Sequence, residues 1–554
     1  MIFSLPSFAR DIEYTHENQT LIYTVIDEEA KTVKTKAGTV SSEDEPVAGN
    51  AFSGNTYFNL VIPSQIEVDD VKYDVIEIGE YGFYKGRLLK SVTIPNSVKK
   101  IGAHAFESCT LFTSFTIPNS VKEIGEYAFY DCYNITSVTI SESVTEIKGN
   151  VFSECWNLTS VSIPNSVKKI GKEAFYNCYR LTSVSIPNSV TEIGESAFEL
   201  CGLTSITIPN SLTEIRAHTF EYCPLTSVSI PSSVTEIGED AFVGCYPTYA
   251  EFASIEALCR INFANPEANP LRWGSSLYID GKEVTSLIIP ESVTEIKDYA
   301  FYGCESLTSV SIPGSVTKIG EEAFSYCEFT SAEFASIEAL CGIDFADENA
   351  NPLAFGWRDG SKWYPCLLYI DGKEVTSLTI PESVTEIKDY AFYNCRKLTS
   401  INISEGVTSI GSYAFYMPFS INVPSITIPQ NITSIGKYAF QGIYPGEITY
   451  LADEPIEAKG IFYSSVSTSA TLYMSEAGAE YVEKNNTEPW CNFTNIKVVE
   501  GSSAIDEVIA DFDVDAPCEV FLLTGVKVAD TTVDLPAGIY IVRQGDTVKK
   551  IAVN

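Results

Sequence analysis

The sequence is dominated by a repeated unit of about 23 residues, of which Leu181 to Cys201 (LTSVSIPNSVTEIGESAFELC) is a clear copy. The phenylalanine of the unit recurs at thirteen positions, which are Phe83, Phe106, Phe129, Phe152, Phe175, Phe198, Phe220, Phe242, Phe301, Phe324, Phe392, Phe415 and Phe440. A unit this short buries too little apolar surface to offset the entropy of ordering its own chain, whereas stacked units cover each other's apolar faces. The repeat therefore predicts a solenoid whose stability is a sum over neighbouring units.

Within one unit, apolar residues alternate with hydroxyl residues from Leu181 to Ile186, which predicts a half-buried strand that Pro187 ends. A second short apolar step closes at Gly194. The segment around Phe198 is too short for a stable independent helix, so we expect one helical or 3-10 turn there. The expected fold class is a β-rich solenoid with short helical or 3-10 turns, a period of 22–23 residues, and caps at both ends.

Ten of the 15 cysteines stand three residues after the repeated phenylalanine, at Cys109, Cys132, Cys155, Cys178, Cys201, Cys223, Cys245, Cys304, Cys327 and Cys395. Side chains that point the same way from neighbouring turns have poor disulfide geometry. No C-x-x-C pair and no nearby histidine supports a metal site. We expect reduced, buried packing cysteines, and neither a metal nor another cofactor.

The formal net charge is −37 and the sequence pI is near 4.4. This negative charge argues against nucleic acid and anionic membrane surfaces as partners, because binding to either requires a positively charged surface on the protein. Much of the acid precedes the second-strand isoleucine, at Glu123, Glu146, Glu192, Glu214 and Glu236. We interpret this row as a solvated outer face, with a cation-binding surface as the alternative. No apolar run approaches the length of a transmembrane helix.

The sequence offers no pattern of an enzyme. The first strand of each unit carries hydroxyls at its two outward positions, from Ser91 to Ser185, and no charged residue or histidine breaks that row. His104 and His218 are interpreted as surface substitutions. Asp511–Asp515 has D-x-D-x-D spacing but lacks the glycine and the later glutamate of a calcium loop. No phosphate-binding loop, nucleophile elbow or zinc motif is present.

Variation collects between the phenylalanine and the next strand, where many residues are aromatic. We expect these side chains to fall in register along one edge of the solenoid and to form a recognition surface for protein or glycan. The alternative is that the rings only cover the turns. The candidate ligand-binding residues there are Tyr130, Tyr133, Trp156, Tyr176, Tyr179, Arg180, Tyr222 and Tyr246.

Two related insertions interrupt the array, at residues 249–290 and 331–381. Each contains a serine that precedes a helix-favouring run and an Asp-Gly pair that predicts a hairpin turn. These residues are Ser254 and Asp280-Gly281 in the first insertion, and Ser336 and Asp371-Gly372 in the second.

The second insertion adds an aromatic, basic loop to an acidic protein. We expect this loop to contact a partner through Trp357, Arg358, Trp363 and Tyr364. A plain loop that packs back on the array is the alternative.

The flanks predict further domains. We interpret residues 1–10 as the remnant of a signal peptide, with an apolar lead-in to the first strand as the alternative. Residues 11–59 are expected to form an N-terminal cap, residues 60–443 the solenoid, and residues 444–500 a C-terminal cap. Residues 504–554 carry strand patterns of their own and predict a small β-domain.

The unit LTSVSIPNSVTEIGESAF resembles the BspA-like leucine-rich repeat family over about Leu60 to Gly442. The tail resembles the C-terminal sorting domain read by the type IX secretion system, notably at Leu535–Val542 and Lys549–Val553. These resemblances imply a leucine-rich-repeat solenoid in a secreted or surface-displayed bacterial protein associated with the outer membrane. They imply a role in adhesion or host-protein binding, and no active site.

Our hypothesis from the sequence is a monomeric adhesin that makes multivalent contacts with a host or extracellular-matrix protein. Two alternatives stay open, a glycan-capturing surface protein for nutrient uptake and a structural spacer.

Overall fold

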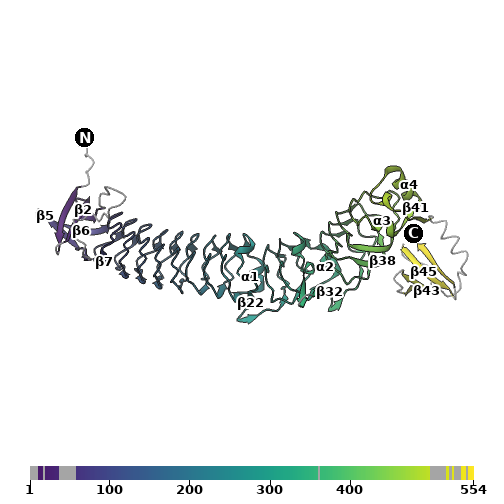
Figure 1. Ribbon diagram of the computed structural model, residues 1–554, viewed down its shortest axis with the longest axis horizontal. Helices are drawn as coiled ribbons and strands as arrows, with labels where there is room; N and C mark the ends of the chain where they lie inside the picture. The colour runs from purple at the N-terminus through teal and green to yellow at the C-terminus, as the bar shows by residue number, and fades with distance from the viewer. Residues whose placement is uncertain are drawn as a thin grey trace. The chain divides into compact units, whose positions relative to one another are not determined.

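The computed structural model describes residues 10–16, 19–36, 58–359, 362–499, 519–522, 527–529, 538–544 and 547–553. The chain divides into two compact units. Figure 1 draws their strands as arrows, coloured in the order of the chain. Unit 1 contains Met1–Thr308 with Glu322–Glu328, and unit 2 contains Ser309–Glu321 with Phe329–Asn554. Each unit is a solenoid built from short parallel strands, so the expected fold class is confirmed.

In unit 1 each turn supplies a first strand to one row and a second strand to another, and both rows pair in parallel and in register. The first strands are β4 (Phe58–Val61), β7 (Leu89–Thr93), β9 (Ser114–Thr116), β11 (Ser137–Thr139), β13 (Ser160–Ser162), β16 (Ser205–Thr207), β18 (Ser227–Ile230), β20 (Tyr249–Phe252), β22 (Ser276–Ile279) and β24 (Ser286–Ile288). The second strands are β8 (Lys100–Ile101), β10 (Glu123–Ile124), β12 (Glu146–Ile147), β14 (Lys169–Ile170), β15 (Glu192–Ile193), β17 (Glu214–Ile215), β19 (Glu236–Ile237), β21 (Asn262–Phe263) and β25 (Glu295–Ile296).

The copy at Leu181–Cys201 departs from the prediction, because residues 181–187 form no strand. The first-strand sheet ends at β13 before this copy, and a new sheet begins at β16 after it. The turn that follows Phe198 is one residue shorter than the turn that follows Phe175. The repeat length therefore changes from 23 to 22 residues at this copy, which is also where the hydrogen bonding between successive first strands is interrupted.

The segment around each phenylalanine consists of single turns rather than a helix. In the copy at Phe198, Cys201 N donates to Phe198 O (3.2 Å) in the 3-10 pattern. Ser196 and Leu200 have left-handed backbones, with φ of +55° and +57°. The amides of Ser196, Phe198 and Leu200 donate instead to carbonyls of the next turn, at 2.8–3.1 Å. Because alternate amides leave the segment, no turn can continue into a helix.

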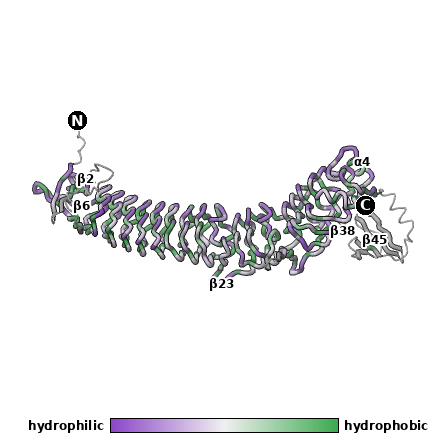
Figure 2. Tube along the Cα trace, in the orientation of Figure 1, coloured by the Kyte–Doolittle hydropathy of each residue, from purple (hydrophilic) through white to green (hydrophobic). Residues whose placement is uncertain are grey.

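The core of unit 1 is a column of stacked phenylalanine rings. Eight successive rings from Phe83 to Phe242 are buried, with neighbouring centroids 5.3–5.8 Å apart. Apolar and polar residues alternate along each turn (Figure 2). Each unit therefore depends on its neighbours, since its phenylalanine ring stacks on the rings of the adjacent turns.

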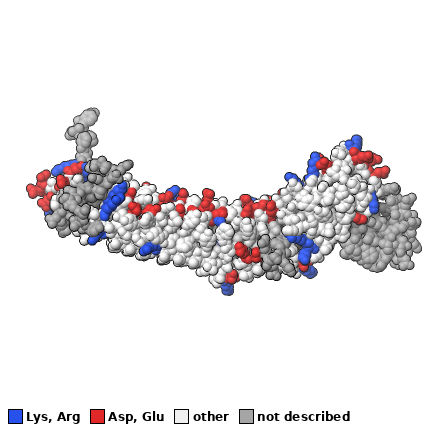
Figure 3. Space-filling model, in the orientation of Figure 1, with Lys and Arg blue, Asp and Glu red and all other residues white. Residues whose placement is uncertain are grey.

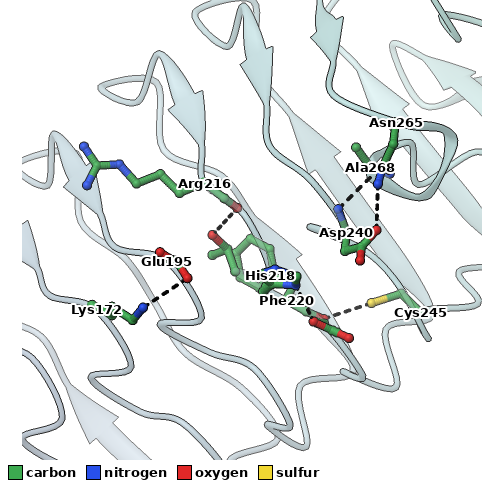
Figure 4. Close-up of polar contacts among 11 residues, drawn as sticks. Lys172, Glu195, Arg216, His218, Phe220, Asp240, Cys245, Asn265 and Ala268 are labelled. Carbon is green, nitrogen blue, oxygen red and sulfur yellow. Dashed lines mark hydrogen bonds and ion pairs between the residues drawn. The ribbon is translucent and has the colours of Figure 1, made fainter.

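The cysteines line a second buried column beside the rings. In seven successive units, from Cys109 to Cys245, the thiol lies 3.1–3.3 Å from the carbonyl oxygen of the phenylalanine one turn earlier. Figure 4 shows this contact between Cys245 and Phe220. All fourteen cysteines in the described part of the chain are free thiols. The expectation of reduced packing cysteines is therefore confirmed for those residues.

Strands that precede the first phenylalanine of the repeat form a sheet that continues the second-strand row. Its strands β1 (Asp11–His16), β2 (Gln19–Asp27) and β3 (Thr32–Thr35) are antiparallel, and β5 (Gln65–Val68) pairs with β6 (Val71–Ile78). Strand β6 pairs in parallel with β3 and with β8. The free edge of β8, the first of the second strands, is thus covered by hydrogen bonding to β6.

The two insertions fold alike, each within its own unit. Ser254 caps α1 (Ile255–Cys259) and Ser336 caps α2 (Ile337–Gly342), each through its side-chain oxygen. Hairpins at the Asp-Gly turns join β22 to β23 (Lys282–Glu283) and β32 (Leu367–Ile370) to β33 (Lys373–Glu374). The short 3-10 helices are η1 (Pro266–Ala268), η2 (Glu348–Ala350) and η3 (Pro352–Ala354). The helix and hairpin predictions are confirmed.

Unit 2 repeats the same plan and ends in a helical cap. Its remaining strands are β26 (Ser309–Ile312), β27 (Lys318–Ile319), β28 (Ser331–Phe334), β29 (Asp344–Phe345), β34 (Ser377–Thr379), β35 (Glu386–Ile387), β36 (Ser400–Asn402), β37 (Ser409–Ile410), β38 (Ile421–Ile428), β39 (Ser434–Ile435), β40 (Ile443–Tyr450), β41 (Thr471–Ser475) and β42 (Ile496–Val499). Helices α3 (Val466–Ser469) and α4 (Glu476–Asn485) precede η4 (Trp490–Asn492), which buries Trp490.

The tail contains an antiparallel sheet of four strands in the order β44-β43-β45-β46. These are β43 (Glu519–Leu522), β44 (Lys527–Ala529), β45 (Gly538–Gln544) and β46 (Thr547–Val553). All four strands lie within residues 504–554, the segment for which the sequence predicts strands.

Candidate functional site

Three of the expected aromatic residues stack on one another along an edge of unit 1. The ring centroids of Tyr133 and Trp156 lie 5.8 Å apart, and those of Trp156 and Tyr179 lie 6.4 Å apart. Trp156 is 40% exposed and Tyr179 is 49% exposed. The indole Nε1 of Trp156 donates to Glu154 (2.6 Å), which also accepts from Asn177 (2.8 Å). We call Tyr133, Trp156 and Tyr179 the aromatic ridge.

The other expected residues do not form a single row with the ridge. Tyr130 and Tyr176 stand one residue after the phenylalanine, are half-buried, and have a pKa that burial raises. Tyr222 lies over Gly244, and Tyr222 and Tyr246 are well exposed. Arg180 is exposed beside Tyr179. The edge therefore carries a short stack of rings followed by separate exposed rings.

The basic loop of the second insertion is a hairpin of β30 (Gly356–Asp359) and β31 (Lys362–Pro365). Trp357 stands opposite Tyr364, and Arg358 stands opposite Trp363. Tyr364 is half-buried. The side chains of Trp357, Arg358 and Trp363 lie outside the described part of the structure, so contact with a partner through them stays a prediction.

A second row of rings, two residues before the phenylalanine, was not expected from the sequence. In unit 1 the ring of His104 stacks between Tyr81 (4.5 Å) and Tyr127 (4.9 Å), and its Nδ1 contacts Glu107. His104 is thus a half-buried member of a stack rather than a plain surface substitution. In unit 2, Tyr390, Tyr413 and Tyr438 form the corresponding row. The same period of 23 residues at this position was the available signal.

A second unexpected feature is Trp273 in the first insertion, which is 64% exposed. The guanidinium of Arg272 lies 4.6 Å from the centroid of its ring. The sequence LRWG differs from LAFG at the same place in the second insertion, and that difference was the available signal.

Acidic residues of the second strands form ion pairs with lysine and arginine side chains. Lys169 lies between Glu146 (3.9 Å) and Glu192 (3.3 Å), and Arg216 pairs with Glu192 at 2.9 Å. In the close-up of Figure 4, the adjacent pair Lys172 and Glu195 also joins neighbouring turns. Acidic side chains gather along one edge in Figure 3, and much of the face drawn there is uncharged. Exposed pairs of this kind add little stability, so the row is mainly a solvated surface.

The hydroxyl face of the first strands is broken at the first insertion. A shallow groove runs over it, lined by hydroxyls such as Ser205 and Thr207, and it ends at Glu251 and Asp280. Glu251 accepts a hydrogen bond from Gly281 N (2.8 Å), which holds the hairpin turn. These acidic residues have a structural reason to stand there.

Candidate metal ligands and nucleophiles among the described residues are dispersed or mostly buried. No group of three or more His, Cys, Asp or Glu in that part of the chain is placed to hold a metal ion. Burial raises the pKa of most of the buried cysteine thiols, to about 12 at Cys109, which suppresses the nucleophilic thiolate. Among the same residues, no helix is both long and apolar enough to cross a membrane.

Comparison with known proteins identifies the repeat. The model of the BspA type leucine-rich repeat region matches residues 76–203, 168–263, 274–346 and 369–469, which is more than half of the chain. No curated protein matches the chain.

Solved structures of bacterial leucine-rich repeat proteins also match. A leucine-rich repeat protein from Bacteroides ovatus is 21% identical, with 89% of this chain and 100% of that chain covered and a TM-score of 0.37. A leucine-rich cell surface protein from Faecalibacterium prausnitzii is 27% identical, with 59% and 95% covered and a TM-score of 0.30. The pneumococcal vaccine antigen PcpA is 16% identical, with 88% and 98% covered and a TM-score of 0.22. From the match of the family model, the chain belongs to the BspA-type leucine-rich repeat family.

Proposed function

We propose that this protein is a secreted or cell-surface bacterial adhesin that binds a host or extracellular-matrix protein by multivalent contact. The leucine-rich-repeat solenoid is typical of binding and scaffold proteins rather than enzymes. Membership of the BspA-type family favours a location outside the cell. The sorting-like tail at residues 504–554 is part of the same proposal.

The observation that carries the proposal is the exposure of the aromatic ridge. The stacked phenylalanines, the thiols and the paired acids each have a structural reason for their positions. Trp156 and Tyr179 are 40% and 49% exposed. Large, rigid rings at a surface supply most of the binding energy in many protein interfaces.

The test uses the full chain and a panel of immobilised matrix proteins, with collagen, laminin and fibronectin as the probes. We expect the double variant Trp156→Ala/Tyr179→Ala to weaken binding to the recognised probe by about 30-fold or more, the size of one hot spot. Tyr249→Ala is the matched control, because Tyr249 is an exposed tyrosine on the first-strand face rather than the ridge.

Loss of binding in the control, with the ridge variant unaffected, would move the site to the strand face and contradict the proposal. A chain that binds none of the probes, and whose exposed rings can be replaced without any effect, would favour the structural spacer.

A further inference from the structure

The first insertion carries an exposed tryptophan. Trp273 is 64% exposed and has φ of +66°. Left-handed residues are regular in the turns of this fold, as at Ser196 and Leu200, so this backbone conformation has a structural reason. The exposure of so large an apolar ring is the feature that the fold itself does not explain.

The second insertion provides a matched comparison. Residues 272–274 (Arg-Trp-Gly) correspond to residues 354–356 (Ala-Phe-Gly). Asn269 donates to two consecutive carbonyls of the following turn at 2.7 and 3.2 Å, and Asn351 does the same at 2.8 and 3.3 Å. Phe355 is half-buried, with φ of −102°. The shared anchor therefore requires neither a tryptophan nor a left-handed residue at this position.

Charged groups surround the ring of Trp273. The Arg272 guanidinium lies 4.6 Å from its centroid and forms an ion pair with Glu267 at 2.9 Å. The carboxylate of Glu305 lies against Gly274, where an added Cβ would come within 3.2 Å of Oε2. One tryptophan thus carries a planar apolar surface with a guanidinium and a carboxylate close by.

Two tyrosines belong to the same region of unit 1. Tyr302 contacts Tyr326 edge to face, with centroids 5.3 Å apart, and Tyr326 is 60% exposed. The turn at Tyr302 lies directly against the turn at Trp273, because a Cβ added to Gly303 would come within 2.9 Å of Arg272 Cα and 3.2 Å of Trp273 N. We call Arg272, Trp273, Tyr302, Glu305 and Tyr326 the Trp273 platform.

The chemistry of the platform selects a neutral ligand with one apolar face and a polar rim. The net charge of −37 and Glu305 oppose an anion. A cation at the ring would be repelled by the positive charge of the Arg272 guanidinium, which lies 4.6 Å from the ring centroid. A pyranose ring has an apolar face of C–H groups and a rim of hydroxyls. We propose that the Trp273 platform binds a neutral sugar ring, which stacks on Trp273 while Arg272 and Glu305 hydrogen-bond its hydroxyls.

The test measures binding of the full chain to immobilised neutral hexasaccharides of glucose, mannose, xylose, galactose and N-acetylglucosamine. We expect at least one of them to bind, and Trp273→Ala to weaken that binding about tenfold or more. Phe355→Ala is the matched control and should leave binding unchanged. Trp273→Phe should retain part of the affinity, and thermal melts of all variants check that the fold is intact.

Three results would overturn the proposal. The first is that none of the neutral hexasaccharides binds. The second is that the one that binds does so equally well with the Trp273→Ala variant. The third is that Trp273→Ala reduces binding of hexalysine, or of an anionic hyaluronate hexasaccharide, instead. The aromatic ridge is tested separately, because Trp156→Ala should leave saccharide binding intact whether or not the adhesin proposal holds.

Discussion

The buried thiols make the solenoid sensitive to alkaline pH. Burial raises the pKa of Cys109, Cys245, Cys259 and Cys341 from 9.0 to about 12. Each thiol therefore holds its proton more tightly in the folded chain than in the unfolded chain. The stabilisation is fully present below pH 9, the unfolded value, and is lost as the pH rises toward 12.

The expected loss follows from proton linkage. Each such thiol lowers the free energy of unfolding by about 1.4 kcal/mol for each pH unit above 9. The four thiols together remove about 5 kcal/mol between neutral pH and pH 10, which is comparable with the whole stability of many domains. Burial also raises the pKa of Tyr302 and Tyr390 to about 12. These two tyrosines contribute to the loss of stability mainly above pH 10, because the ordinary pKa of tyrosine is about 10. The decline between pH 9 and 10 is thus specific to cysteine.

The assay is urea unfolding followed by circular dichroism from pH 7 to 10.5 in the presence of a reductant. Cys109→Ala and Cys245→Ala should each reduce the decline above pH 9 by about 1.4 kcal/mol per pH unit. A thiol reagent at pH 8 should label the cysteine column only after unfolding. Stability that stays flat to pH 10, or rapid native labelling of several column thiols, would refute the reasoning.

Four further substitutions test stability by chemical unfolding, and the last of them is also followed by hydrogen exchange. Phe175→Ala should cost about 3–5 kcal/mol because Phe175 is buried between two rings. Phe83→Ala should cost about 1 kcal/mol less, since one described ring stacks on it, and equal costs would contradict a ring–ring contribution. Gly442→Ala should destabilise unit 2, because φ is +90° and the new Cβ would lie 2.0 Å from Met417 O; a neutral result would refute this close approach. Asn269→Ala should cost about 2 kcal/mol by leaving two buried carbonyls without their donor, and unchanged hydrogen exchange in the first insertion would argue against it.

Much of the fold could be predicted from residues that repeat. The alternation before Pro187 predicts strands, and most copies have them in register. The place of Cys178 in the unit predicts a buried free thiol, and it is one. Ser254 and Ser336 predict two helix starts, and both cap a helix. These predictions succeed because the same local pattern recurs in every unit and determines which side chains point into the core and which point to solvent.

The candidate site depended more on tertiary structure. Sequence alone placed Tyr133, Trp156 and Tyr179 at one position of the unit, which is why they stack. It could not separate the half-buried Tyr130 from the exposed Tyr179, because exposure depends on what the neighbouring turn places above each ring.

The sequence by itself determined the solenoid, the column of phenylalanines, the reduced cysteines and the family, because each of these follows from the period. Only the tertiary structure decided the left-handed turns, the stack around His104 and the exposure of Trp273. The physical reason is that these features arise where backbone hydrogen bonds pass between turns and where an insertion meets the following turn. A linear pattern contains the residues on both sides of such a contact, but it does not state that they meet.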